Sequence, residues 1–227
     1  MSGKLFIVST HIGNLDDLTL RAKRVLTEVD FIICEELKIA KQLLRQIEIT
    51  KELIELNEHT EKVNSNIIIE LLISGRNAAL ISDSGTPIFS DPGNHLIKLV
   101  IDKGINISII PGPDSLIPSL IVSGFGISKF YYAGWLSIKS DLRKKELKNL
   151  KNIKQTIAIM ETPYRLKQLL QDVMNVFGEK IKICLACDLT TTNEIIFRGE
   201  IKNVFEEIKN RALKPEFILV IDNNQKN

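Results

Sequence analysis

The sequence predicts an α/β protein built of two tandem α/β domains, with a mostly parallel sheet in the first domain, a mixed sheet in the second and a cleft between them. In the first half of the 227 residues, short apolar runs alternate with segments of helical periodicity, as in strands joined by crossover helices. These apolar runs are unbroken, which indicates a parallel sheet covered on both faces. In the second half, apolar runs follow one another with short connections, which favours a mixed sheet. We expect domains at 1–122 and 123–227, with a hinge at 123–126.

The first domain is expected to alternate strands and helices along its whole length. Strands are predicted at 4–9, 30–35, 52–56, 77–82 and 105–110. Helices are predicted at 19–28, 37–47, 61–74 and 92–103. Asp16 and Asp17 are candidates to cap the first helix, and Gly75 and Gly104 follow the ends of the last two.

The second domain is expected to begin after a helix that Asp114 or Ser115 caps. Its strands are predicted at 129–133, 155–161, 180–187, 194–199 and 216–221. Its helices are predicted at 139–151, 163–176 and 201–211, the first of them rich in lysine.

The composition is that of an ordinary globular protein, with 44% hydrophobic and 26% charged residues. Thirty basic and 28 acidic residues leave a net charge of +2, so contact with nucleic acid requires a local patch rather than a global field. The first residues do not form a secretory signal, and no uncharged run approaches the ~20 residues of a membrane span. We therefore expect a cytoplasmic protein that does not associate with membranes.

Cys184 and Cys187 form a C-x-x-C pair, a spacing that also occurs in redox and zinc sites. Residues 180–187 alternate like a strand, in which positions i and i+3 point to opposite faces. No second cysteine pair or well-spaced histidine pair is present to complete a metal site. We predict that both cysteines are buried structural residues and that the protein has no metal site.

Four loops rich in glycine, proline and small polar residues follow predicted strands of the first domain: 10–14, 35–36, 82–93 and 111–115. Because the carboxyl ends of parallel strands meet at one edge of a sheet, all four are expected to lie together, where α/β proteins bind ligands. Gly13, Gly85 and Gly112 allow the backbone to approach a small molecule closely. The chain lacks a G-x-G-x-x-G dinucleotide motif and a G-x-x-x-x-G-K-[ST] phosphate loop, so those classes of site are poorly supported.

Several motifs resemble one family in order and separation. They are T-H-I-G-N-L at 10–15, S-D-S-G-T-P at 82–87 with S-D-P-G at 90–93, P-G-P at 111–113, G-W-L at 134–136, E-T-P-Y-R at 161–165, D-L-T at 188–190 and R-G at 198–199. They resemble the tetrapyrrole-methylase superfamily, and within it the bacterial 16S ribosomal RNA (cytidine-2′-O)-methyltransferases. The family patterns are T-P-I-G-N-L, D-A-G-T-P-x-I-S-D-P-G, P-G-P-S-A, E-S-P-H-R and E-L-T.

The resemblance implies S-adenosyl-L-methionine as the methyl donor, bound in the cleft, and 16S rRNA of the small ribosomal subunit as the acceptor. It also implies a homodimer. Matched residue by residue, the donor contacts are expected at Ile12, Ser84, Gly85, Thr86, Phe89, Asp114, Ser115, Met160 and Leu189. The expected reaction is direct in-line displacement, in which a ribose 2′-oxygen attacks the sulfonium methyl.

A hydroxyl is a weak nucleophile, so a positioned base would assist it. Glu35, Glu36 and Asp83 are candidates because each ends a predicted strand at the cleft edge. For each of them, capping a helix or binding backbone is an equally good interpretation.

Basic side chains on two predicted helices are candidates for RNA contact. They are Lys38, Lys139, Arg143, Lys144 and Lys148. Lysines of this kind more often only cover a solvent-exposed helix face, but both helices follow loops at the expected cleft edge, so contact with RNA phosphates is a reasonable hypothesis. Trp135 and Tyr164 are candidates to stack an unpaired base, with core packing as the alternative for Trp135.

Two motifs depart from the subfamily. Cys34-Glu35-Glu36-Leu37-Lys38 replaces A-E-D-T-R, and residues 187–194 lack an Arg and a Lys of R-E-L-T-K-x-x-E. The sequence also ends at Asn227, without the C-terminal extension common in the subfamily. We expect these departures to affect the acceptor more than the donor. Two alternatives stay open: a methyltransferase of the same superfamily with a tetrapyrrole or other small acceptor, and a donor-binding, ribosome-associated module with reduced catalysis.

Overall fold

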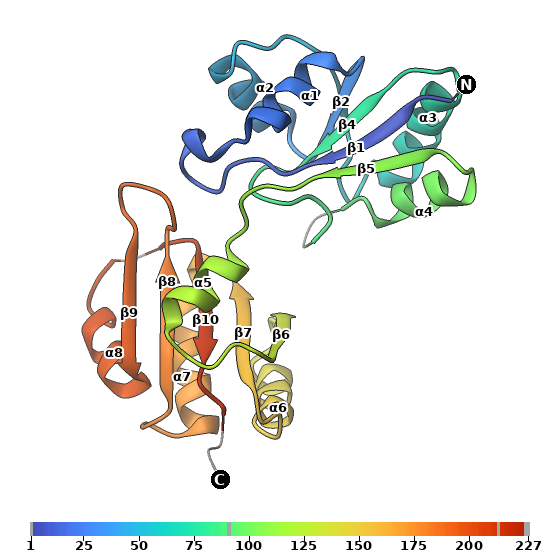
Figure 1. Cartoon of the computed structure of the whole chain (residues 1–227). Helices are drawn as coiled ribbons and strands as arrows, with labels where there is room; N and C mark the ends of the chain where they lie inside the picture. Colours follow the sequence, from blue (N-terminus) through green and yellow to red (C-terminus); the bar gives the residue numbers. More distant parts are fainter. Residues whose placement is uncertain (1, 90–91, 213, 225–227) are drawn as a thin grey trace. The chain divides into compact units, whose positions relative to one another are not determined.

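The computed structural model of the chain describes residues 2–89, 92–212 and 214–224 (Figure 1). The chain divides into two compact units, Met1–Asp114 and Ser115–Asn227. Each unit has a five-stranded sheet of its own. The prediction of two α/β domains is therefore confirmed, and each unit is described separately below.

The boundary between the units follows Asp114 rather than residue 122. The reason is the helix α5 (Leu116–Ser123), which packs against the sheet of the second unit. Its residues Leu116 and Leu120 are buried in a cluster with Cys184 and Val220. The expected hinge at 123–126 consequently lies inside the second unit, where the Gly126 carbonyl accepts a hydrogen bond from Thr156 Oγ1 at 2.7 Å.

The sheet of the first unit is parallel throughout, with the strand order β3-β2-β4-β1-β5. Its strands are β1 (Lys4–Val8), β2 (Phe31–Cys34), β3 (Glu52–Glu55), β4 (Ala78–Ile81) and β5 (Asn106–Ile110). β2 and β4 are buried along their whole length. This burial explains their unbroken apolar sequences, because helices cover both faces of the sheet.

The helices of the first unit lie in pairs on the two faces of its sheet (Figure 1). α1 (Leu20–Glu28) and α2 (Leu37–Gln46) pack on one face, against strand residues such as Val8 and Ile32. α3 (Glu61–Ile73) and α4 (Asn94–Asp102) pack on the other, against Leu5 and Ile33. Neighbouring strand residues thus alternate between two hydrophobic cores, as the pleat of a strand requires.

Two helix starts in the first unit differ from the predictions. Thr19 caps α1, since its side chain accepts a hydrogen bond from Ala22 N at 3.0 Å, while Asp16 and Asp17 lie in the short 3₁₀ turn η1 (Leu15–Asp17). α4 begins at Asn94 instead of residue 92, because Gly93 has a φ of 129° that no helix accommodates.

The sheet of the second unit is mixed, with the strand order β6-β7-β10-β8-β9. Its strands are β6 (Phe130–Trp135), β7 (Thr156–Glu161), β8 (Lys182–Cys187), β9 (Ile195–Glu200) and β10 (Phe217–Ile221). β6 runs parallel to β7, and the other pairings are antiparallel. The mixed sheet expected from the sequence is confirmed.

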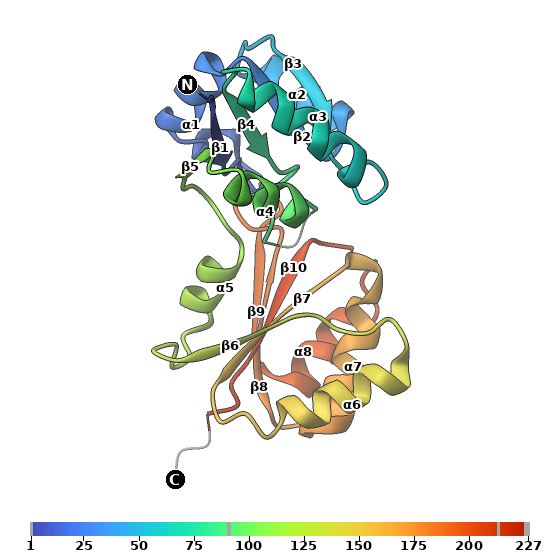
Figure 2. The same ribbon diagram turned by 90° about the vertical axis from the view of Figure 1, so that its right-hand side faces the viewer.

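Three helices cover one face of this sheet and α5 covers part of the other (Figure 2). They are α6 (Ser140–Leu150), α7 (Leu166–Phe177) and α8 (Ile201–Ile208), and the 3₁₀ turn η2 (Pro163–Arg165) precedes α7. Cys187 packs into the core under these helices, whereas Cys184 packs on the face of α5. The prediction that the two thiols lie buried on opposite faces of a strand is confirmed.

None of the helices within the described ranges has the length and apolar character that crossing a lipid bilayer requires.

Candidate functional site

The carboxyl edge of the first unit's sheet contains a topological switch point between β1 and β4. These two strands are parallel neighbours, yet the helices that follow them, α1 and α4, cover opposite faces of the sheet. The two loops therefore leave the sheet in opposite directions. Ligand sites of open α/β sheets form in the crevice that such diverging loops create.

The loops after β1 and β4 are joined by hydrogen bonds. Thr10 N donates to the Gly85 carbonyl at 2.9 Å, and Gly85 N donates to the His11 carbonyl at 3.1 Å. The hydroxyls of Ser9 and Thr86 lie 2.9 Å apart, within hydrogen-bond distance. Gly85 and Thr86, both expected to contact the donor, are thus fixed against the first loop.

The loop after β5 approaches the same place. A Cβ atom added to Gly85 would lie 3.1 Å from Ile12 Cγ2 and 3.6 Å from the Pro113 carbonyl oxygen. A Cβ atom on Gly112 would lie 2.9 Å from Ser9 Cβ. Three of the four loops that the sequence singles out consequently pack together, and small residues permit this approach.

The loop 82–93 also contains a strained residue that sequence reasoning missed. Ile88 has a φ of 73°, an unusual conformation for a β-branched side chain. Residues held in such conformations cluster at ligand-binding sites. Phe89, an expected donor contact, follows it and is exposed. Ser90 and Asp91 of the S-D-P-G motif lie outside the described residues.

The three candidate bases lie at the ends of β2 and β4. An oxygen of the Asp83 carboxylate accepts a hydrogen bond from Glu36 N at 3.4 Å and so links the loop at 35–36 to the loop 82–93. Glu36 precedes α2, and its side chain makes no capping hydrogen bond. Glu35 is partly buried, whereas Glu36 is exposed. The backbone-binding interpretation thus applies to Asp83 in part, and a role as base stays a prediction for each of the three.

The chemistry of this edge fits a small ligand with polar, uncharged groups and one cationic centre. The loops 9–14, 82–89 and 111–114 contribute main-chain groups, hydroxyls and carboxylates, and His11 is the one basic residue type among them. The buried Nδ1 of His11 has no hydrogen-bond partner among the described residues, so this position can accept a ligand group or a water. His11 was not among the predicted site residues. It stands where the family pattern has proline, and this difference was the signal in the sequence that could have identified it.

Three expected donor contacts belong to the second unit. Ser115 precedes α5 without a capping hydrogen bond from its side chain. Met160, in β7, accepts a hydrogen bond from the Tyr132 hydroxyl at 2.8 Å. Leu189 lies between Asp188 and Thr190, two non-glycine residues with φ of 47° and 67°. The turn at Leu189 is thus strained in the way that functional turns often are.

The basic residues expected to contact RNA divide into exposed and buried ones. Lys38 on α2 and Lys139 and Lys148 on or beside α6 are exposed. On α2, Lys41 and Arg45 also line a surface groove of about 700 Å³ that extends to Lys51. Lys144 is partly buried and lies 3.7 Å from Asp172 Oδ1.

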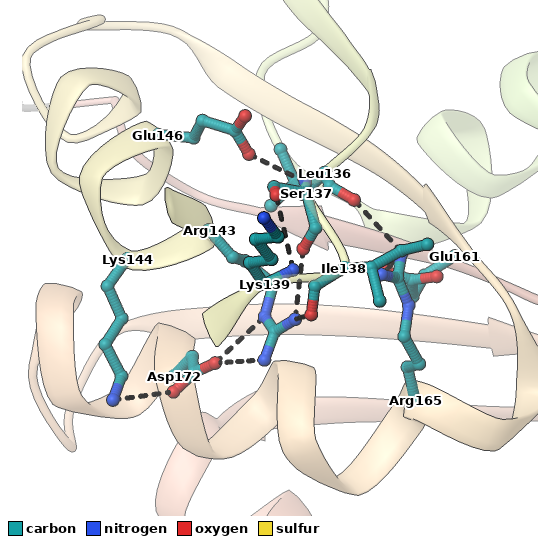
Figure 3. A network of polar contacts seen from close by, with 10 residues as sticks. All are labelled: Leu136, Ser137, Ile138, Lys139, Arg143, Lys144, Glu146, Glu161, Arg165 and Asp172. Atoms are coloured by element: carbon teal, nitrogen blue, oxygen red, sulfur yellow. Dashed lines mark hydrogen bonds and ion pairs between the residues drawn. The ribbon is translucent and has the colours of Figure 1, made fainter. Parts of the chain in front are cut away.

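The prediction for Arg143 is wrong. Its side chain is 1% exposed, and its guanidinium donates twice to Asp172 Oδ2, at 2.9 and 2.7 Å (Figure 3). A guanidinium that makes these bonds inside the unit does not reach a nucleic-acid phosphate. The lysine-rich composition of 139–151 concealed this, although Arg143 lies four and seven residues before Leu147 and Leu150, the other buried residues of α6.

Comparison with known proteins gives a consistent result. The sequence pattern described as Tetrapyrrole (Corrin/Porphyrin) Methylases matches residues 4–204. A protein of Thermotoga maritima named ribosomal RNA small subunit methyltransferase I is 35% identical over 98% of this chain and 100% of its own length. The protein of that name from Haemophilus influenzae is 38% identical over 100% of this chain and 81% of its own.

Solved structures share the fold. Diphthine synthase superposes with a TM-score of 0.75 at 15% identity, over 97% of this chain and 89% of its own. A cobalamin biosynthetic enzyme, cobalt precorrin-4 methyltransferase, superposes with a TM-score of 0.73 at 14% identity, over 98% of this chain and 96% of its own. At these identities the likeness concerns the fold alone.

Proposed function

Because the chain belongs to the tetrapyrrole (corrin/porphyrin) methylase family, whose methyl donor is S-adenosylmethionine, we propose that it methylates RNA of the small ribosomal subunit. The acceptor proposed is the 2′-oxygen of a cytidine ribose in 16S rRNA. The relatives from Thermotoga maritima and Haemophilus influenzae, both named as methyltransferases of small-subunit ribosomal RNA, support the RNA acceptor, whereas the cytidine 2′-oxygen rests on the resemblance of the motifs.

The observation that carries the donor assignment is the packing of three loops at the switch point of the first unit. A Cβ atom on Gly85 would make a tight contact of 3.1 Å with Ile12 Cγ2, and both main-chain groups of Gly85 bond to the loop after β1. When bound, S-adenosylmethionine supplies an electrophilic methyl group on a cationic sulfonium. Ile12, Ser84, Gly85, Thr86, Phe89 and Asp114 would hold the donor in this unit, with Ser115, Met160 and Leu189 as the proposed contacts of the second unit.

The protein's own contribution would be orientation and proton transfer. Fixed loops that hold the reactants in line remove much of the entropic barrier to the reaction. Carbonyls and carboxylates near a cationic centre stabilise it without adding a competing positive charge. Glu35, Glu36 or Asp83 would accept the proton that the ribose hydroxyl releases.

The base is identified by comparing Glu35→Gln, Glu36→Gln and Asp83→Asn. Loss of a general base lowers kcat by about 10²- to 10⁴-fold. We expect one of the three variants to show this loss with an unchanged dissociation constant for the donor. Equal, small losses in all three would mean that none of them is the base.

The oligomeric state and the cellular location of the protein are also proposals. The family resemblance supports a homodimer, which sedimentation equilibrium of the purified protein would test. We also propose a cytoplasmic location, which an RNA acceptor in the small ribosomal subunit supports. Absence of the protein from the cytosolic fraction, detected with an antibody after cell lysis and fractionation, would contradict this location.

The proposed function is tested by methyl transfer from labelled S-adenosylmethionine to small ribosomal subunits. We expect label in the RNA, and none when the target nucleotide is a 2′-deoxynucleotide. Label on a tetrapyrrole with none on the subunits would favour a small acceptor. Donor binding without any transfer would indicate a binding module that has lost catalysis.

A further inference from the structure

Two aromatic side chains are exposed at one edge of the second unit's sheet. Trp135 is the last residue of β6 and is 47% exposed, and Tyr164, in the turn after β7, is 82% exposed. β6 and β7 are parallel, with Trp135 in register with Met160, so both aromatics follow the same ends of adjacent strands. Because about half of Trp135 is exposed, core packing does not account for the whole side chain.

The loop that follows Trp135 is fixed by a buried arginine although it has no regular structure. Arg143 Nη1 donates to the carbonyls of Ser137 and Ile138 at 3.1 and 3.0 Å (Figure 3). The rest of the guanidinium bonds to Asp172, and the Glu146 carboxylate accepts from Ser137 N at 2.8 Å. Loop 136–139 is therefore held from both its N–H and its C=O sides.

A second arginine connects this loop to the turn that carries Tyr164. Arg165 Nη2 donates to the Leu136 carbonyl at 3.0 Å and pairs with the buried carboxylate of Glu161 (Figure 3). Arg165 is the residue next to Tyr164. The same guanidinium thus fixes the chain after Trp135 and the chain beside Tyr164.

A buried cation, Arg143, beside a second that is mostly buried, Arg165, is not explained by stability alone. Buried ion pairs lose most of their attraction to the cost of desolvation, and apolar replacements are often as stable. What the two arginines provide is a rigid backbone beneath exposed side chains. Rigid presentation lowers the entropy lost on binding, which is how preorganised sites gain affinity.

The exposed side chains around the aromatics combine apolar surface with positive charge. Ile138 is 81% exposed, and the neighbouring Lys139 is also exposed. Lys214 Nζ lies 5.1 Å from the centroid of the Tyr164 ring. Aromatic faces flanked by lysines are typical of surfaces on which single-stranded nucleic acid stacks its bases while its phosphates meet the cations.

We propose that Trp135 and Tyr164 form a stacking site for unpaired bases of the RNA acceptor, with Arg143 and Arg165 as the positioning residues that hold it in place. The assignment rests on the RNA acceptor of the proposed function and adds where the RNA is gripped. Lys214 beside the Tyr164 ring and the exposed Lys139, four residues after Trp135, favour an anionic partner such as RNA over an uncharged protein surface. Arg143, which does not touch RNA, would then affect RNA binding through the loop 136–139.

Trp135 allows a direct test because it is the single tryptophan of the chain. A short single-stranded oligoribonucleotide is titrated into the protein while tryptophan emission is followed, with the duplex of the same sequence as comparison. We expect quenching by the single strand and weaker quenching by the duplex. Trp135→Ala and Tyr164→Ala should each weaken binding of the single strand and of small ribosomal subunits by about 5- to 100-fold, whereas Trp135→Phe and Tyr164→Phe should retain most of the affinity.

The positioning role is tested with Arg143→Lys, which keeps the charge beside Asp172 but cannot donate to both loop carbonyls as well. Its matched control is Ile208→Val on α8, a mild core substitution that does not touch loop 136–139. We expect Arg143→Lys to lower the fluorescence anisotropy of Trp135 in the free protein and to weaken RNA binding. The control should change the unfolding midpoint and leave both readouts as in the wild type.

Three results would overturn the inference. The first is an RNA affinity that does not change in the two alanine variants. The second is a fall in donor affinity that parallels the fall in RNA affinity, which would place Trp135 against the donor. The third is a loss of dimerisation that parallels the loss of RNA binding, which would make this edge a protein interface. The proposed function fails separately. Wild-type protein that binds and is quenched by RNA but transfers no methyl group would refute the methyltransferase assignment and leave the stacking site intact.

Discussion

Gly85 combines a positive φ with a close approach to a neighbouring loop at the candidate donor site. Its φ of 76° disfavours any L-residue, and its missing side chain leaves room for Ile12. Gly104 shares a positive φ of 66° but has open space around it. The two glycines therefore separate the cost of backbone strain from the cost of a close approach.

We predict that Gly104→Ala lowers the free energy of unfolding by about 1–2 kcal/mol, the cost of a left-handed L-residue, and that Gly85→Ala lowers it by more, because Ile12 must also shift. Only Gly85→Ala should also weaken donor binding, because its new methyl group displaces the loop after β1. Calorimetric titration with S-adenosylmethionine, beside urea unfolding, measures both effects. Equal donor affinities in the two variants would remove Gly85 from the donor site.

The three cysteines are buried in apolar surroundings. Burial raises the pKa of Cys34 and Cys187 from 9.0 to about 12 and that of Cys184 to about 11, and the Asp83 carboxylate adds to the shift at Cys34. A pKa raised in the folded state stabilises the protein below the unfolded-state value, and this stability is lost as the pH rises through the folded-state value.

We therefore predict a free energy of unfolding that falls between about pH 9 and pH 11. Each thiol contributes up to about 1.4 kcal/mol per pH unit in that window, because it ionises in the unfolded chain and stays protonated in the folded one. A variant with Cys34→Ala, Cys184→Ala and Cys187→Ala should show a shallower fall in urea unfolding at the same pH values. Identical pH slopes would contradict the prediction.

At the level of elements, the sequence indicates most strands and helices because their apolar periodicity is strong. β2 and β4 are buried on both sides, and their sequences contain only apolar residues. The gathering of the loops 10–14 and 82–93 at one sheet edge was also foreseeable, since both follow parallel strands, but the strand order that makes this edge a switch point was not. What no pattern reveals is which sheet a helix joins. α5 follows the strands of the first unit in sequence and packs on the second.

The sequence also conceals tertiary use of polar residues. Arg143 shares the helix face of the buried Leu147 and Leu150, but its partner Asp172 lies 29 residues further along the chain, and the many lysines around it suggest an exposed face instead. Thr19 caps α1 in place of Asp16 and Asp17, because these two aspartates lie in the 3₁₀ turn η1 that precedes the helix. Both differences arise from contacts or backbone angles that intrinsic propensity does not determine.

The assignment of α5 to the second unit has a testable consequence. Leu120 is buried against the sheet, whereas Ile121 of the same helix is 62% exposed. We predict that Leu120→Ala costs about 2–5 kcal/mol and that Ile121→Ala stays within about 0.5 kcal/mol. Hydrogen exchange should show lost protection in β8 and β10 for Leu120→Ala, with β1 and β4 unchanged. Loss confined to β1 and β4 would return α5 to the first unit.

For the whole molecule, the charge balance determines how it meets a polyanion. With 30 basic and 28 acidic residues, the long-range field is weak. Several acidic residues sit close to basic ones, as in the pairs Arg76–Glu52 and Lys202–Glu179. The electrostatic part of the affinity for RNA then depends on lysines that are not paired with a carboxylate when RNA is bound. The salt dependence of the affinity reports how many such lysines contact phosphates.

We predict that Lys38→Gln, Lys139→Gln and Lys148→Gln each reduce the slope of log affinity against log salt concentration by about one unit or slightly less, since each phosphate contact releases roughly one condensed counterion. The matched control is Lys202→Gln on α8, an exposed lysine whose ammonium is bonded to Glu179 at 2.5 Å. Its slope should equal that of the wild type. Binding of small ribosomal subunits measured by filter retention between low and physiological salt gives the slopes. A variant that weakens binding equally at all salt concentrations would show that its lysine acts through the fold rather than through a phosphate.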